Sequence, residues 1–107
     1  MKALNSIKFV VEAGAAFNKW LNAIDNASSY EEAKKPANAA FGFVDCMTTY
    51  LNCMIAAENN EFTANLDELL TEWEATIYQR MICKAMQTKQ PCDVIRSLEE
   101  KREQIEG

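Results

Sequence analysis

Cysteine is the most reactive residue type in this chain, which has four of them. Cys46 and Cys53 are seven positions apart in a stretch with helical periodicity. At 1.5 Å per residue, their Cα atoms are about 10.5 Å apart along the helix axis. That separation is too long for a disulfide and for two thiolates on one zinc ion. We therefore expect both to be reduced and to pack as small apolar residues.

Cys83 and Cys92 are the candidate reactive or bridging thiols. Cys83 lies on a polar helix flank with Gln79, and Cys92 falls in the expected first turn of the last helix. Helix starts favour the thiolate form, so we expect Cys92 to react more readily. Two alternatives are a bridge between Cys83 and Cys92, or two bridges from this pair to Cys46 and Cys53. Since nothing marks the chain as secreted, we expect free thiols.

The chain has no histidine, which removes the usual partner from most catalytic and metal sites. Di-iron sites in helical bundles use Glu-x-x-His pairs, and serine or cysteine nucleophiles normally need a histidine base. There is also no nucleophile elbow, Walker loop or glycine-rich dinucleotide turn. An all-carboxylate metal site and a buried lysine or tyrosine base are the remaining alternatives. We expect no enzyme activity, no cofactor and no metal.

Acidic residues are unevenly distributed along the chain. The net charge is −5, but residues 36–79 contain seven acids and neither lysine nor arginine. This composition argues against direct nucleic-acid binding, which needs clustered basic residues. It favours a basic protein partner instead. The predicted acidic patch consists of Glu61, Asp67, Glu68, Glu72 and Glu74.

Apolar residues recur every three or four positions through most of the chain, which predicts helices and no strands. Ser29 and Glu32 form a capping-box pattern, and Pro36 favours a new helix start. We therefore expect an all-α, compact antiparallel four-helix bundle, with a short extra helical turn between the first two helices. Residues 1–107 form a single domain. The expected helices run from about Leu4 to Ala27, Pro36 to Ala57, Asn65 to Lys89 and Pro91 to Ile105.

The helix expected at Pro36–Ala57 is unusual because Asp45 is its only charge. It is almost long enough to span a bilayer, but an aspartate near its middle costs about 3 kcal/mol on insertion scales. We expect a core helix of a soluble protein with packed neighbours on several sides, some from a second chain. The aromatic and methionine residues on two sides of the helix predict a dimer interface. Its candidate residues are Phe43, Met47, Tyr50 and Met54.

These features predict a non-enzymatic, cytoplasmic protein that acts by protein–protein binding, as an adaptor or inhibitor. In size and charge it is comparable to immunity proteins and phage-type inhibitors of basic nucleic-acid enzymes. We expect a homodimer built on the Pro36–Ala57 helix and, because of Asp45, no membrane partner. Lys8 and Glu12 interrupt the apolar N-terminal stretch, so we expect mature structure there rather than a signal peptide. The alternative function is a small-molecule carrier or sensor with an apolar pocket between helices.

Overall fold

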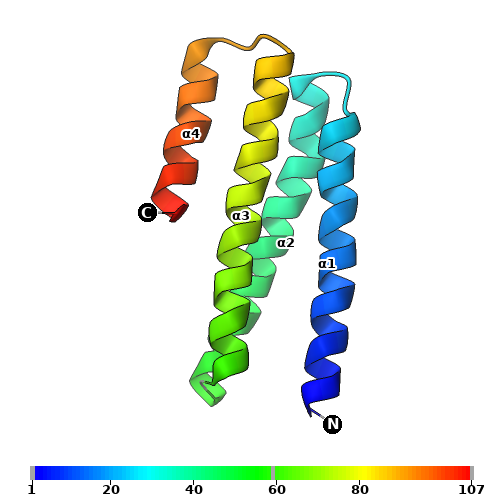
Figure 1. Cartoon of the computed structure of the whole chain (residues 1–107), viewed down its shortest axis with the longest axis vertical. Coiled ribbons are helices and arrows are strands. Elements are labelled where there is room, and N and C mark those ends of the chain that lie inside the picture. Colours follow the sequence, from blue (N-terminus) through cyan, green and yellow to red (C-terminus); the bar gives the residue numbers. More distant parts are fainter. Residues whose placement is uncertain (1, 59, 107) are drawn as a thin grey trace.

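The computed structural model describes residues 2–58 and 60–106, with side chains from residue 8 onward. This part of the chain forms four helices: α1 (Lys2–Asn26), α2 (Tyr30–Ala57), α3 (Glu61–Gln87) and α4 (Cys92–Glu106). Each helix runs antiparallel to the next (Figure 1). The predicted all-α class and four-helix bundle are therefore confirmed.

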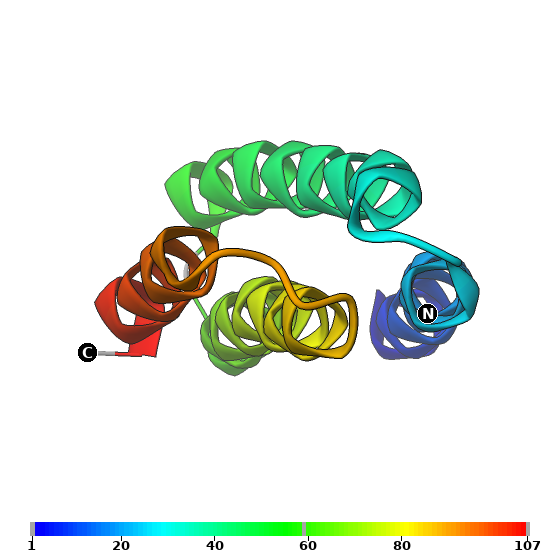
Figure 2. The same ribbon diagram turned by 90° about the horizontal axis from the view of Figure 1, so that it is seen from above.

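Helix α3 is the centre of the bundle. Within the described residues it packs against α1, α2 and α4, whereas α4 has no backbone neighbour in α1 or α2. Seen along the helices, α1, α3 and α4 form one layer and α2 lies alone across them as a second layer (Figure 2). The Cα atoms extend 49 × 26 × 15 Å, so the bundle is elongated and thin. Consequently α2 has neighbours on one side only.

Helix α2 begins at the predicted capping residue. Ser29 is extended, and its side chain accepts a hydrogen bond from the Glu32 amide at 3.1 Å. The Glu32 carboxylate in turn accepts from the Ser28 amide at 2.9 Å. The expected short helical turn therefore exists, but it is the first turn of α2 rather than a separate element.

The expected helix start at Pro36 is wrong, because α2 begins at Tyr30 and continues through this proline. A proline inside a helix removes a single hydrogen bond, here the one from residue 36 to the carbonyl of Glu32. Tyr30, Ala33 and Ala37 are buried on either side of it. Their packing and the Ser29 cap hold the turns that precede the proline.

Helix α3 begins four residues before the expected Asn65. Asn60 is its N-cap: the Asn60 carboxamide accepts from the Thr63 amide, and the Thr63 hydroxyl accepts from the Asn60 amide, both at 3.0 Å. Threonine takes the position that glutamate or glutamine occupies in the usual capping box. The expected start at Asn65 is therefore wrong, because a threonine three positions after the cap is a weaker sequence signal than the usual glutamate or glutamine.

The core consists of two adjoining clusters of buried side chains. The larger joins α1, α2 and α3 and includes Phe17, Ile24, Ala33, Ala40 and Ile77. The smaller joins Met47 and Leu51 of α2 to Leu66 and Leu70 of α3. Phe17 stacks on Trp73 with ring centroids 4.6 Å apart. Leu66, Ile77 and Met81 of α3 are buried, whereas Val11 of α1 is 65% exposed.

A buried lysine ties α3 to the end of α1. Lys84 is 6% exposed, and its Nζ donates hydrogen bonds to the carbonyls of Asp25 at 3.0 Å and Ala27 at 2.8 Å. These carbonyls lie at the C-terminal end of α1, where helices leave acceptors unpaired. Lys84 thus lies in the last turn of α3, while the carbonyls that it binds lie at and just after the end of α1. Arg80 adds an ion pair with Asp25.

Candidate protein-binding surface

The side of α2 that points away from the other helices is exposed and almost uncharged. At 3.6 residues per turn it covers about 160° of the helix circumference over a length of about 28 Å. Asp45 is its only charge. We call it the outer face of α2, and it consists of the exposed residues Asn38, Ala39, Gly42, Asp45, Cys46, Thr49, Tyr50, Asn52, Cys53 and Ala56.

Helix α2 is also the helix of the described chain that is long and apolar enough to cross a membrane, judged by length and composition alone. The core helix of a bundle passes the same test, but such a helix is mostly buried. In α2 only 22% of the apolar window is buried. The expected packing on several sides is therefore not supplied by the helices of this chain.

The polar groups of the outer face are partly satisfied by the helix itself. The Thr49 hydroxyl donates to the carbonyl of Asp45 at 3.1 Å, and the neighbouring Thr48 hydroxyl donates to Val44 at 2.8 Å. These bonds satisfy the hydroxyl protons, while the hydroxyl oxygens can still accept. A chain that covers the outer face therefore does not have to supply acceptors for these threonines.

Three of the four residues predicted for a dimer interface turn toward the bundle rather than away from it. Met47 is buried, and Phe43 and Met54 are partly buried. The Phe43 ring lies 5.2 Å from Trp20 and 6.4 Å from Trp73, between centroids. Tyr50 is 54% exposed and sits at the edge of the outer face, 5.9 Å from the Phe9 ring.

The centre of the exposed surface lies at Gly42, Cys46 and Cys53, residues that the sequence analysis did not assign to an interface. Their signal was present in the sequence as a stripe of small and polar residues without lysine or glutamate. Phe43 and Tyr50 were expected to form a second apolar side of the helix, which would leave only a narrow polar stripe between the two sides. In the structure, the Phe43 side chain packs against Trp20 of α1 and Trp73 of α3 instead. It therefore does not cover the small residues of the outer face.

The two ends of α2 differ in charge: Glu31 and Glu32 balance Lys34 and Lys35 at the N-terminal end, whereas the C-terminal end is acidic. Lys34 forms an ion pair with Glu31 at 3.0 Å and lies 5.3 Å from the centre of the Tyr30 ring. The hydrogen bond to Glu31 raises the pKa of Lys34. Lys35 is exposed in line with the outer face, and no ion pair of the described residues includes it. At the other end Glu58 and Glu61 are exposed.

The predicted acidic residues do not form one patch. Asp67 and Glu74 are seven positions apart on the side of α3 that faces α2, whereas Glu61, Glu68 and Glu72 follow one another at steps of seven and four on a different side. Burial raises the pKa of Glu74, and the charge of Asp45 on α2 raises it further. The pKa of Tyr78 is raised by burial and by Glu74 and Asp45.

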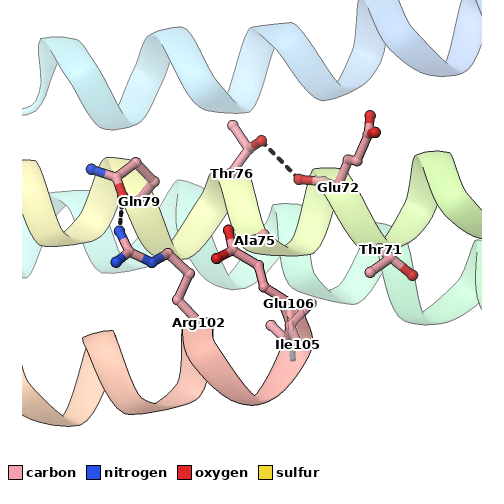
Figure 3. Close-up of a pocket in the computed structure, with 8 residues that line it drawn as sticks. All are labelled: Thr71, Glu72, Ala75, Thr76, Gln79, Arg102, Ile105 and Glu106. Atoms are coloured by element: carbon pink, nitrogen blue, oxygen red, sulfur yellow. Dashed lines mark hydrogen bonds between the residues drawn. The ribbon is translucent and has the colours of Figure 1, made fainter.

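A polar groove lies between α3 and the C-terminal half of α4, with a volume of about 550 Å³. Arg102 of α4 donates a hydrogen bond to Gln79 of α3, and the Arg102 Nε is buried without a hydrogen-bond partner in the described residues (Figure 3). Ile105 and Ala75 are the apolar residues of the lining; the others are Thr71, Glu72, Thr76, Gln79, Arg102 and Glu106. None of these residues is aromatic or a methionine, so the groove differs from the apolar pocket expected for a carrier.

All four cysteines are free and exposed. Cys46 and Cys53 belong to the outer face of α2, so they do not pack in the core as expected. Cys83 accepts a hydrogen bond from the Gln79 side chain at 3.6 Å, and Cys92 is the first residue of α4. In the described residues no group of three or more cysteine, aspartate or glutamate side chains could hold a metal ion.

Comparison of the chain with protein-family models, with curated proteins and with solved structures found no match. Its function must therefore be inferred from its own residues.

Proposed function

We propose that this protein acts by binding other protein chains, and that the outer face of α2 is its main contact surface, where it associates with a second copy of itself. The observation that carries the proposal is the exposure of this face, with Asp45 as its only charge, on a helix that has neighbours on one side only. Exposed apolar patches usually mark sites of association, and Cys46, Tyr50 and Cys53 supply the apolar part of this one. We expect a homodimer without catalytic activity.

A protein surface fits the outer face better than a lipid bilayer does. Asp45, Asn38 and Asn52 lie along one edge of the face. In a bilayer an aspartate costs about 3 kcal/mol, and asparagine side chains lose their hydrogen bonds to water. A protein partner can supply those hydrogen bonds and still cover the alanines and cysteines between the polar edge and Tyr50. The face therefore favours another helix over lipid.

The acidic flank of α3 supports a second contact, with a basic protein. Glu61, Glu68 and Glu72 are exposed and lie on one line of the helix, away from the outer face of α2. Charges at the rim of a contact increase the rate of encounter more than the affinity. In this proposal α2 holds two copies together while the flank of each copy attracts the basic partner. Adaptor and inhibitor functions both fit this arrangement.

The test is the mass in solution, measured by size exclusion with light scattering in the presence of reductant. We expect twice the chain mass of 12.1 kDa at micromolar concentration. Gly42→Glu places a charge at the centre of the outer face, where a Cβ meets no atom within 4 Å in the monomer. Because the contact would then bury a carboxylate that has no partner of opposite charge, the dissociation constant should rise about 100-fold.

Asn22→Glu is the matched control, since it adds the same charge to an exposed residue of α1. We expect it to leave the dimer unchanged. Both variants should retain the helical circular dichroism of the wild type. A wild type that is monomeric at every concentration would refute self-association through α2. A dimer that both variants leave intact would refute the role of the outer face.

A further inference from the structure

The residues along the middle of the outer face have the spacing of a helix-pairing seam. Ala39, Gly42, Cys46, Thr49, Cys53 and Ala56 follow one another at steps of three and four, which is the repeat of two helices that pack side by side. All six are exposed. No helix of the described chain covers them, because α1 and α3 pack on the opposite side of α2 and α4 has no backbone neighbour in α2.

The size of the seam residues determines how close a partner helix can come. None has a side chain larger than threonine, and the distance between two packed helices depends on the side chains at their contact. An ordinary core seam uses leucine or isoleucine instead. Tyr50 and Phe43 border the seam on one side, and Asp45 and Asn52 border it on the other. The seam is thus a shallow strip that accepts an equally smooth helix.

Charge favours one direction for a second copy. The N-terminal end of α2 is balanced, with Glu31 and Glu32 beside Lys34 and Lys35, while Glu58 and Glu61 make the C-terminal end acidic. A parallel copy would set the two acidic ends side by side, where like charges repel each other. An antiparallel copy separates them and brings Lys35 of each helix toward the acidic end of the other. The antiparallel arrangement also sets the two helix dipoles in opposition.

One register uses the whole seam. When a two-fold axis passes between Met47 and Thr48, each seam residue faces a seam residue of the other copy: Ala39 faces the partner's Ala56, Gly42 faces the partner's Cys53, and Cys46 faces the partner's Thr49. A shift by one heptad in either direction leaves part of the seam without a counterpart. In the full register Asp45 also lies within a turn of the partner's Asn52, whose amide can donate to the carboxylate.

We propose that α2 pairs antiparallel with α2 of a second copy, with the two-fold axis between Met47 and Thr48. The inference rests on the proposed self-association and adds its orientation and register. Each copy contributes the same strip of small residues, so the interface is isologous and closes as a dimer. The two bundles then lie on opposite sides of a central pair of α2 helices.

The test is disulfide cross-linking between Cys53 and a cysteine introduced at position 42. In a background with Cys46→Ser, Cys83→Ser and Cys92→Ser, the Gly42→Cys variant should form a covalent dimer on mild oxidation. The main band should shift from 12.1 kDa to twice that mass without reductant and return with it. Within one chain these two positions are about 16 Å apart along α2, so they cannot bond to each other.

The matched control carries Gly42→Cys together with Cys53→Ser. In the antiparallel register, the two introduced thiols of a dimer lie about 16 Å apart and should not cross-link. Efficient cross-linking of this control would overturn the proposal in favour of a parallel pair. A dimer by light scattering that cross-links in neither variant would overturn the register and leave the proposed function standing.

A monomer by light scattering would refute the proposed function and this inference together. In that case, sedimentation with phosphatidylcholine–phosphatidylglycerol vesicles distinguishes the remaining occupant. Retention of the protein on these vesicles would assign the outer face to lipid, and no retention would leave the face uncovered. Both results contradict a second copy on α2.

Discussion

The inner and outer faces of α2 share a lack of charge but differ in the volume of their side chains. On the inner face Val44, Met47 and Leu51 fill the space between α1 and α3, and all are at most 9% exposed. On the outer face Gly42 and Cys53 occupy the corresponding length of helix and are exposed. A core needs large side chains to fill the space between helices, whereas two helices that approach closely need small side chains at their contact. The lack of charge alone does not distinguish a core face from a contact face.

The largest expected difference between the two faces is in the free energy of unfolding after a side chain is shortened. Leu51→Ala deletes a side chain that is 1% exposed in the smaller core cluster, next to Leu66 and Leu70. It should lower the free energy of unfolding by about 2–5 kcal/mol, because both transfer energy and packing are lost. Urea denaturation followed by circular dichroism measures this change as a lower midpoint with an unchanged slope.

Cys53→Ala is the counterpart on the outer face and should change the free energy of unfolding by less than about 0.5 kcal/mol. Both variants are best compared in the Gly42→Glu background, so that dimer formation does not contribute to stability. An equal loss in the two variants would mean that Cys53 is packed within the monomer, which would contradict the exposed face.

The reverse experiment adds volume to two adjacent alanines. Ala40 is fully buried against α1 and α3, whereas Ala39 is exposed on the outer face. Ala40→Leu should destabilise the monomer by about 1–3 kcal/mol, because the core has no room for three further carbon atoms. Ala39→Leu in the same background should have an effect within about 0.5 kcal/mol. Thermal unfolding of the two variants side by side gives the comparison, and similar losses would show that both sides of α2 are packed.

Much of this contrast could be predicted from the sequence. The apolar residues that recur at helical spacing include Phe17, Leu21 and Ile24, and these are buried, because an apolar side chain on a repeating face packs in the core. The Ser29 cap was also correct. The starts of α2 and α3 were not, since packing of Tyr30 and Ala33 outweighs the preference of Pro36, and Thr63 replaces the usual acid in the Asn60 cap.

The interface could be predicted less well, because a helical pattern fixes the side on which a Cβ lies but not how far a large side chain reaches. Phe43 lies toward the outer side of α2 by its position, yet its ring contacts Trp20 and Trp73. The prediction of one acidic patch was wrong for a related reason, namely the direction of each side chain around the helix. Glu72 and Glu74 are neighbours in sequence, but two positions on a helix differ by about 200°, so they face opposite sides of α3.

The smallest expected effect lies at the boundary between the two faces, where Asp45 of α2 approaches Glu74 of α3. Burial first, and the Asp45 charge second, raise the folded-state pKa of Glu74 above its ordinary value of 4.5. The ionised carboxylate therefore destabilises the fold, and the stability of the wild type decreases as the pH rises through that pKa. Glu74→Gln removes this loss, so it should be slightly more stable than the wild type at pH 7, by less than about 0.5 kcal/mol because the site is partly exposed. The advantage should vanish below about pH 4.5, where Glu74 is protonated in both states.

Thermal unfolding of the wild type and Glu74→Gln between pH 3 and 8 measures this difference (about 5 pH units suffice to span the titration). Asp45→Asn, which leaves Glu74 in place, should reproduce only part of the gain, because the Asp45 charge is the lesser of the two causes. A full gain in Asp45→Asn would show that charge repulsion between α2 and α3 outweighs burial. If neither variant is more stable than the wild type, solvent reaches the boundary at Asp45 and Glu74 and screens both charges. The inner face of α2 would then be narrower than the burial of Val44 and Leu51 indicates.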